Sequence, residues 1–329
     1  MPHETSPSRI LVRAPNWLGD SVISAGAVRA LKHSFPQAHL TVAAPARLAP
    51  VWRLLPEIDE VLELPANDLL GTVRMLRGKA GFELALLLPN SLRAALEIWL
   101  ARIPRRVGFR GHHRAWLLTE IAPERAKPGP IEHQVHRYER LIATIGATTA
   151  APPLNFARAA ANGVTKLALC PGAEYGPAKR WLPERFAEVA AQIAAEQPVK
   201  WILFGTAADS EVGAQIAAQL ADQCQNRIGL TSVDDLINEL RECRLLLTND
   251  TGTMHLATLL GVPVVAVFGS TEHRLTGPLG GAHTVIRHHV ECSPCFLREC
   301  PIDFRCMNAV SSDEVIAAVR TALHQNGNG

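Results

Sequence analysis

The sequence predicts an α/β protein built from two Rossmann-like, doubly wound domains with a cleft between them. At 329 residues the chain is about twice as long as one typical domain. Short apolar stretches alternate with amphipathic ones, the pattern of a parallel sheet covered by helices. This pattern restarts after residues 147–161, a small and nearly uncharged segment that we interpret as a linker. We therefore expect an N-terminal domain over 1–150 and a C-terminal domain over 151–329.

The first half opens with the β-like segment 9–13, which runs into the turn APNWLGD at 14–20. Residues 21–34 then have helical spacing, and Pro36 ends the helix. Further strands are predicted at 40–44, 61–64 and 83–88, where the run ELALLL has the continuous apolar character of a fully covered parallel strand.

The second half repeats this order. The strand KLALC at 166–170 leads into the loop 171–179, and a helix over 183–196 begins with a proline. The other predicted elements are strands at 200–204, 245–248 and 262–268, a helix over 209–220 and a final helix over 312–324. Ser311 and Glu314 have the spacing of a capping box before that final helix.

Composition excludes several classes of protein. With 47% hydrophobic and 19% charged residues the chain has enough apolar material for sizeable cores, and a net charge of +2 is too balanced for a dedicated nucleic-acid coat. The first 150 residues carry 19 basic and 13 acidic side chains, whereas the remainder carries 14 and 18. A basic first half fits an anionic partner. The alternative is ordinary scatter around zero in two soluble domains.

The chain ends and the cysteine content bear on location. The first eight residues are polar, and no stretch approaches the roughly 18 apolar residues of a membrane span. We therefore expect a cytosolic protein with no transmembrane segment, in which seven cysteines are thiols or metal ligands before they are disulfides.

Two loops are candidates for binding phosphate, although the sequence contains neither a P-loop nor a GxGxxG motif before a helix. The segment NDTGTMH at 249–255 follows an apolar strand, and such a turn presents backbone N–H groups at a helix N-terminus. Hydroxyls of Thr251 and Thr253 could add donors; alternatively, Asp250 or Thr251 only caps the helix.

The second loop, PGAEYGPAKRW at 171–181, also follows a strand. It carries Lys179 beside Arg180, and a lysine there can supply a point charge for a diphosphate. The alternative is a solvated pair of charges. Ligands of open α/β sheets bind beyond the carboxyl ends of strands, where both loops lie.

Asp20 ends the loop that follows the first strand. A carboxylate on a glycine-bearing turn beside a cleft is a candidate general base. The competing interpretation is that Asp20 only caps the helix that begins at Ser21.

Five segments together resemble glycosyltransferase family 9, the ADP-heptose:lipopolysaccharide heptosyltransferases: NWLGDSV, LLLPNSLRAAL, RRVGFRG, PGAEYGPAKRW and TNDTGTMHLA. The resemblance runs from about residue 9 to residue 268 and returns in the final helix. It implies a GT-B architecture with the acceptor on the N-terminal domain and the ADP-sugar on the C-terminal one. It also implies an inverting transfer of L-glycero-D-manno-heptose from ADP-heptose to the heptosyl-Kdo-lipid A inner core at the membrane surface.

The resemblance also implies residue roles. Asp20 matches the proposed base and Lys179 the phosphate lysine; the family's diphosphate turn falls on Asp250, Thr251 and Gly252, followed by Thr253 and His255. The ribose-binding acid falls near Asp209, with Glu211 as a possible substitute. Asn90, Arg106 and Arg110 are the candidates for acceptor binding, the alternative for the arginines being a solvated basic loop. No cofactor is needed, because Lys179 and the turn amides can stabilise the leaving ADP.

Four cysteines depart from the family pattern. Cys292, Cys295, Cys300 and Cys306 form C-x2-C-x4-C-x5-C, within the range of a structural tetrathiolate zinc site. The second pair lacks the tight x2 spacing, so we favour free thiols slightly over a zinc site, and disulfides are the least expected in a cytosolic protein.

Other functions compete with the transferase. A sugar-nucleotide epimerase on the same GT-B scaffold, or another ADP-sugar transferase of the family, would use similar loops. A non-catalytic nucleotide-sensing protein is a third possibility, and Asp20 argues against it because a pure binder has no use for a base.

Overall fold

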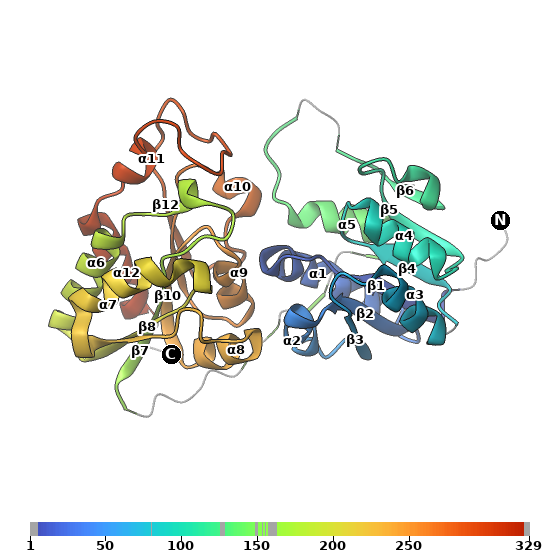
Figure 1. Ribbon diagram of the computed structural model, residues 1–329, viewed down its shortest axis with the longest axis horizontal. Helices are drawn as coiled ribbons and strands as arrows, with labels where there is room; N and C mark the ends of the chain where they lie inside the picture. Colours follow the sequence, from blue (N-terminus) through green and yellow to red (C-terminus); the bar gives the residue numbers. More distant parts are fainter. Residues whose placement is uncertain are drawn as a thin grey trace. The chain divides into compact units, whose positions relative to one another are not determined.

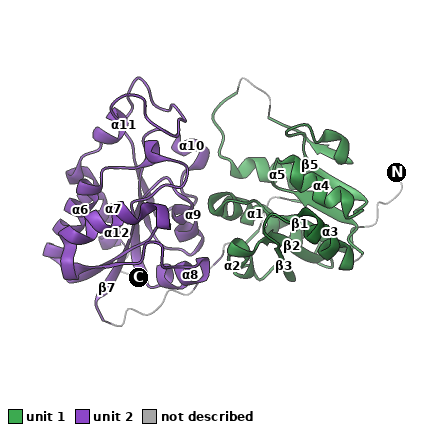
Figure 2. Cartoon of the chain, in the orientation of Figure 1, with its two compact units in different colours: residues 1–153 green, residues 154–329 purple. Residues whose placement is uncertain are grey.

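A computed structural model describes residues 6–79, 81–125, 129–148, 151–152, 154, 156 and 163–325. The chain divides into two compact units, Met1–Pro153 and Leu154–Gly329, coloured separately in Figure 2. The boundary expected after residue 150 falls three residues before this division. Most of the expected linker at 147–161 lies outside the described residues. The two units are described one at a time.

Unit 1 is a parallel sheet of six strands in the order β3-β2-β1-β4-β5-β6, with helices on its faces (Figure 1). The strands are β1 (Arg9–Arg13), β2 (His39–Pro45), β3 (Glu60–Leu64), β4 (Leu84–Leu87), β5 (Arg105–Phe109) and β6 (Glu120–Ala122). The helices are α1 (Leu18–Ser34), α2 (Ala49–Arg53), α3 (Leu69–Gly78), α4 (Leu92–Leu100) and α5 (Val135–Ala143), with short 3-10 turns η1 (Ala46–Leu48) and η2 (Ala115–Leu117).

Unit 2 is a second parallel sheet of six strands, in the order β12-β11-β10-β7-β8-β9. Its strands are β7 (Thr165–Cys170), β8 (Val199–Leu203), β9 (Cys224–Asn226), β10 (Cys243–Asn249), β11 (Val264–Val267) and β12 (His283–Ile286). Its helices are α6 (Pro183–Glu196), α7 (Ser210–Leu220), α8 (Val233–Arg241), α9 (Gly252–Leu259), α10 (His273–Thr276), α11 (Arg305–Asn308) and α12 (Ser312–Gln325), with 3-10 turns η3 (Pro177–Lys179), η4 (Ala207–Asp209) and η5 (Ala221–Gln223).

The two sheets have the same topology. When each unit is numbered from its own first strand, both read 3-2-1-4-5-6, the Rossmann order. The order reverses between the first and fourth strands, which are β1 and β4 in unit 1 and β7 and β10 in unit 2. Loops leaving the carboxyl ends of these strands therefore meet at one edge of each sheet, where such folds bind ligands. The predicted α/β class with two Rossmann-like units is confirmed.

Each unit has its own apolar core, as expected when both faces of a parallel sheet are covered. In unit 1 the central strands are fully buried, with Leu11 and Leu87 at 0% exposure. In unit 2, Trp181 and Phe186 pack edge to face with ring centroids 4.9 Å apart. Burying one such large side chain contributes roughly 1.5–3 kcal/mol. Because Trp181 ends the loop that carries Lys179, this packing anchors that loop to the core.

Two predicted helix starts were wrong, and one strand was not predicted. Helix α1 begins at Leu18 with Trp17 as its N-cap, so Asp20 lies in the first turn and does not cap the helix. The segment RRVGFRG, for which a solvated basic loop was the alternative interpretation, contains strand β5, which pairs with β4 and β6. The apolar run that follows the NDTGT turn predicts a helix starting at His255, but helix α9 begins three residues earlier, at Gly252, because the side chain of Thr251 caps it.

None of the helices formed by the described residues is both long and apolar enough to cross a membrane.

Candidate active site

Asp20 lies in a half-buried polar cluster in unit 1, between α1 and the helix α5 that packs on it. The side-chain amide of Gln134 donates a hydrogen bond to Asp20 Oδ1 over 2.7 Å, and the Tyr138 hydroxyl donates a second bond. Burial raises the pKa of Asp20 above its usual value, although these two bonds and the charge of Arg137 pull it down. A carboxylate that is partly dehydrated and held by neutral donors is suited to accept a proton.

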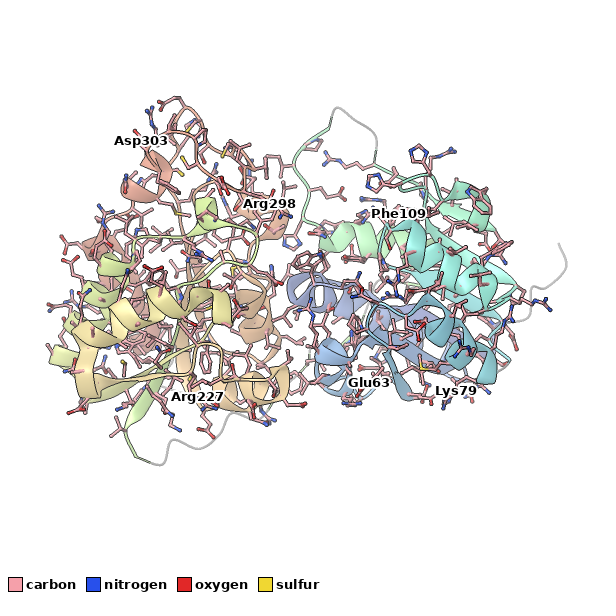
Figure 3. All side chains as sticks on the ribbon, viewed as in Figure 1. Glu63, Lys79, Phe109, Arg227, Arg298 and Asp303 are labelled. Carbon is pink, nitrogen blue, oxygen red and sulfur yellow. The ribbon has the colours of Figure 1, made fainter. Side chains whose placement is uncertain are left out.

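Asn90 is joined to the same cluster through Arg137. It follows β4, and its Oδ1 accepts a hydrogen bond from the Arg137 guanidinium over 2.7 Å. Arg137 stacks on the Phe109 ring, labelled in Figure 3, with Cζ 4.1 Å from the ring centroid. Arg114, with 0% exposure, donates to Asn90 Oδ1 over 3.4 Å and to the backbone carbonyls of Phe109 and Pro89. The loops after β4 and β5 and the start of α5 therefore meet around Asn90.

The two arginines predicted to bind the acceptor lie in different environments. Arg106 donates to the backbone carbonyls of Leu117, Ile103 and Pro104 over 2.7–2.9 Å, and burial lowers its pKa. This geometry gives Arg106 a structural role in fastening β5 to its neighbours. Arg110 is exposed at the end of β5 and stays a candidate for binding the acceptor.

Lys179 and Asp250 form an ion pair at the switch point of unit 2. Lys179 Nζ lies 2.6 Å from Asp250 Oδ2, and the side chains are 14% and 5% exposed. The hydroxyl of Thr271, in the loop after β11, donates to the same carboxylate oxygen over 2.7 Å. The loops after β7, β10 and β11 thus meet on Asp250. A carboxylate repels phosphate, so this arrangement makes Asp250 a residue that orients Lys179 rather than one that touches a diphosphate.

The hydroxyls of the turn after β10 point inward. Thr251 Oγ1 accepts a hydrogen bond from Met254 N over 3.3 Å and lies 3.2 Å from Thr248 Oγ1, which donates to the carbonyl of Cys170 over 3.2 Å. The structure therefore shows Thr251 as the helix cap, the alternative to a role of its hydroxyl in an anion site. The first backbone amides of α9 have no carbonyl partner within the helix, so an anion at this turn would be bound by backbone N–H groups.

The remaining candidates of unit 2 are buried or exposed to different degrees. Asp209 is 3% exposed and already accepts hydrogen bonds from Arg180 and from the backbone and hydroxyl of Thr206. Glu211 is exposed in the first turn of α7. His255 is buried in α9. Of the two acids considered for the ribose, Glu211 is the one with an exposed side chain.

The cysteine-rich loop 292–306 packs on the loop that carries Lys179. Arg298, labelled in Figure 3, accepts a hydrogen bond from Ala178 N over 3.0 Å through its carbonyl. The guanidinium of Arg298 and the ammonium of Lys179 lie 5.2 and 4.9 Å from the centroid of the Tyr175 ring. The Tyr175 hydroxyl donates to Phe296 O over 2.8 Å. The cysteine-rich loop thus supports one wall of this site.

The four cysteines of that loop are free thiols in the structure. Burial raises the pKa of Cys306, and the proximity of Cys292, Cys295 and Cys300 raises it further. Among the residues that the structure describes, no group of three or more His, Cys, Asp or Glu side chains could hold a metal ion. The zinc site therefore stays a prediction for metal analysis.

Comparison with known proteins decides the family. The model of glycosyltransferase family 9 (heptosyltransferase) matches residues 72–304. The chain belongs to glycosyltransferase family 9. It is 33% identical to lipopolysaccharide heptosyltransferase 2 of Escherichia coli (strain K12) and 34% identical to that of Salmonella typhimurium, in each case over 85% of this chain and 88% of the relative. Family membership makes the protein an enzyme, a glycosyltransferase, as the sequence predicted.

Solved structures of the family agree with the fold. The E. coli ADP-heptose LPS heptosyltransferase II superposes with a TM-score of 0.82 at 30% identity, over 96% of this chain and 99% of that one. A family 9 glycosyltransferase from Veillonella parvula superposes with a TM-score of 0.84 at 22% identity, over 97% and 98% of the two chains, and shows the fold alone. The predicted GT-B class of two Rossmann-like units is therefore shared with known members of family 9.

Several residues of this family 9 site were not found by sequence reasoning. Gln134, Arg137 and Tyr138 surround Asp20 from α5, although Gln134 is 114 positions away along the chain. Thr271 reaches Asp250 from the loop after β11, and the hydroxyl of its neighbour Ser270 is buried with no hydrogen-bond partner among the described residues. None of these residues belongs to a motif, and the only signal was their place after a strand or before a helix.

Proposed function

We propose that this protein is an inverting glycosyltransferase of lipopolysaccharide biosynthesis. In this proposal it moves L-glycero-D-manno-heptose from ADP-heptose to the heptose of heptosyl-Kdo-lipid A. The similar lipopolysaccharide heptosyltransferase 2 and ADP-heptose LPS heptosyltransferase II of E. coli support an ADP-heptose donor and a lipopolysaccharide acceptor. The observation that carries the proposal in the chain itself is the buried Lys179–Asp250 pair beside the N-terminus of α9, which is a cation and an anion-binding turn at one switch point.

Unit 2 is assigned the ADP-sugar. Lys179 would neutralise charge on the diphosphate, and Asp250 and Thr271 would keep its ammonium in place. The backbone amides from Thr251 to Thr253 would bind the oxygens of the β-phosphate, and Asp209 or Glu211 the ribose hydroxyls. His255, in helix α9 just after this turn, is assigned to the same ADP-sugar site. Because the cation and the amides supply the stabilisation of the leaving group, no metal ion takes part in the proposed chemistry. A zinc ion on the four cysteines would be structural only.

Unit 1 is assigned the acceptor and the base. The carboxylate of Asp20 would take the proton from the acceptor hydroxyl while that oxygen attacks the anomeric carbon of the heptose. The bond between the anomeric carbon and the diphosphate oxygen would break, and its electron pair would leave with ADP. Attack opposite the leaving group inverts the anomeric configuration. The raised pKa of Asp20 favours this role, since a more basic carboxylate accepts a proton more readily. Asn90 and Arg110 are assigned to acceptor binding.

The proposed acceptor determines where in the cell the protein works. Its lipid A portion is held in a membrane, so we propose that the protein works in the cytoplasm, peripherally at the inner face of the inner membrane. The excess of basic side chains in the first 150 residues supports contact with an acceptor that carries carboxylates and phosphates.

The test is a transfer assay with purified protein, ADP-heptose labelled in the sugar and heptosyl-Kdo-lipid A. We expect one labelled heptose in the lipid for each ADP released, with an anomeric configuration opposite to that of the donor. Conversion of ADP-heptose to an isomer without any label in the lipid would contradict the proposal and favour the epimerase. Equal transfer from ADP-glucose or ADP-mannose would favour another ADP-sugar transferase of the family.

A further inference from the structure

Unit 1 contains a cavity of about 540 Å³ that none of the predicted site residues lines. It lies at the carboxyl ends of four neighbouring strands, because its walls come from the loops that follow β1, β2, β3 and β4. This is the edge of the sheet where folds of this kind bind their ligands. The polar side chains that matter for its chemistry are those of Arg13, Asn16, Arg47, Asn67, Arg93 and Glu97.

The charge of the cavity wall is positive. Three arginines and one carboxylate, that of Glu97, line the cavity, so its charged side chains sum to a net charge of +2. Glu97 is 1% exposed and holds two of the arginines: its Oε2 lies 2.9 Å from Arg13 Nε, and its Oε1 lies 3.0 Å from Arg93 Nε. Each carboxylate oxygen therefore fixes one guanidinium through the inner nitrogen. This leaves the terminal nitrogens as the fork that binds carboxylate or phosphate.

The three arginines differ in how many of their terminal nitrogens already donate hydrogen bonds within the protein. The terminal nitrogens of Arg13 reach Ala14 O and Asn16 Oδ1, and one of those of Arg47 donates to Asn16 O over 2.7 Å. Arg93 has a side chain that is 42% exposed, and no hydrogen bond from its terminal nitrogens is found among the described residues. Arg93 thus offers a complete fork to a ligand, and Arg47 offers part of one.

The N-terminus of helix α4 adds to this charge. Ser91 caps α4 by accepting a hydrogen bond from Ala94 N over 3.2 Å, so the positive end of the helix dipole lies at the cavity beside Arg93.

We propose that this cavity binds an anionic group of the acceptor, a carboxylate or a phosphate, at a distance from the hydroxyl that reacts. The inference rests on the proposed function, because it takes the acceptor to be an acidic glycolipid. The loop of residues 14–17 leads from Arg13 to the helix turn that carries Asp20, so one short segment connects the cavity wall with the base. An anion held by Arg93 and Arg47 orients the acceptor, and Glu97 positions Arg13 and Arg93.

The experiment measures KM and kcat for three acceptors: the natural heptosyl-Kdo-lipid A, the same acceptor with its carboxyl groups methylated, and the same acceptor without phosphates. The variants are Arg93→Ala and Arg47→Ala, both at exposed positions. Arg74→Ala is the matched control, since Arg74 is exposed on α3 and does not line the cavity. We expect either cavity variant to raise KM for the natural acceptor by about ten-fold or more, with kcat within about two-fold.

The modified acceptors identify the anion. If the ligand is a carboxylate, Arg93→Ala leaves KM for the methylated acceptor at the wild-type value; if it is a phosphate, this holds for the dephosphorylated acceptor. An equal rise of KM for all three acceptors, or no rise for any, would overturn the proposal. Glu97→Gln should behave as Arg93→Ala does if the protein folds, and it should leave kcat unchanged as a positioning residue does.

A binding measurement separates this inference from the function on which it rests. Inorganic phosphate is titrated calorimetrically into the wild type and into Arg93→Ala, each saturated with ADP so that the donor site is occupied. Weaker phosphate binding in the variant supports the cavity even if the wild type transfers no heptose, which would be a failure of the proposed function alone. Equal phosphate affinity in the two proteins would overturn the cavity as an anion site.

Discussion

The two units share one strand order and carry different chemistry at the same edge of their sheets. In unit 2 the edge bears a buried Lys179–Asp250 pair and a helix N-terminus, which together suit a diphosphate. In unit 1 the corresponding edge bears Asp20, a carboxylate whose pKa is raised by burial, and a cavity with three arginines. The loops, not the sheet, therefore decide what each unit can bind.

The two units also differ in how their cationic side chains are paired with acids. The lysine of unit 2 is neutralised by a single buried acid, so it is held in one place before any ligand arrives. In unit 1, one buried glutamate serves two arginines, which leaves an excess of positive charge. A preset point charge suits a leaving group on which charge develops, whereas an open excess of charge suits capture of an acidic acceptor.

The largest expected effect comes from removing the proposed base of unit 1. Asp20→Asn should lower kcat by about 10²–10⁴-fold, because the amide cannot accept the proton, and should leave the Kd for ADP unchanged. The measurement is single-turnover transfer with ADP titration in parallel, and Asp20→Glu is the matched control that keeps a carboxylate. Turnover of Asp20→Asn at the wild-type rate would remove Asp20 from the mechanism.

The next largest effect comes from removing the lysine that we assign to the ADP-sugar in unit 2. Lys179→Ala should weaken ADP and ADP-heptose by about 1.5–3 kcal/mol and adenosine little, because the contact is with the diphosphate. Lys166→Ala is the matched control, since Lys166 also pairs with an acid, Glu242, at the opposite end of β7. An equal loss for adenosine would mean that Lys179 acts through folding, so thermal unfolding of both variants is measured alongside.

A smaller effect concerns the stability of unit 2 at low pH. Hydrogen bonds and charge from Arg274, with the charge of Arg287, lower the pKa of the buried Glu272 to about 2. Ionised Glu272 therefore stabilises the fold above pH 4.5, and this contribution is lost as the pH falls from 4.5 toward 2. We expect Glu272→Gln to cost about 1–2 kcal/mol of unfolding free energy at pH 7, a value reduced because Arg274 is exposed to solvent. A difference from wild type that is the same at pH 7 and pH 3 would contradict this.

The smallest effect concerns the cysteine-rich loop. If Cys292, Cys295, Cys300 and Cys306 hold zinc, a chelator should lower the melting temperature of the protein, because a closed thiolate site contributes folding energy. Activity measured well below that temperature should survive. Metal analysis of protein purified without a His tag measures occupancy. Loss of turnover with the fold intact would move the metal into the mechanism.

The sequence predicted the parts of this fold that depend on local patterns. The strand at Arg9–Arg13 and the helix at Pro183–Glu196 have the predicted bounds, because each is an apolar run or helical face closed by proline or turn residues. Strand β5 was missed, since RRVGFRG is too basic to look like a buried strand. Its charge is accommodated by Arg105–Glu120 pairing at 2.8 Å and by the backbone bonds of Arg106, which only the tertiary structure reveals.

The candidate site was predicted in part for the same reason. Lys179 and Asp250 lie in motifs after neighbouring strands, so their meeting follows from the topology. The partners of Asp20 lie at the start of and on α5, more than a hundred positions away, and no sequence pattern predicts their contact with Asp20. The cavity arginines were missed because Arg13, Arg47 and Arg93 are isolated in the sequence and meet only where four strands end.

The pH dependence of kcat/KM tests the central claim, that Asp20 acts as the base, most directly. Because the base must be ionised, kcat/KM of the wild type should rise with pH through the pKa of Asp20, at a midpoint above the ordinary aspartate value of 3.8. The residual activity of Asp20→Asn should lack this rise, with folding checked at each pH. The same acid limb in Asp20→Asn as in the wild type would contradict the account.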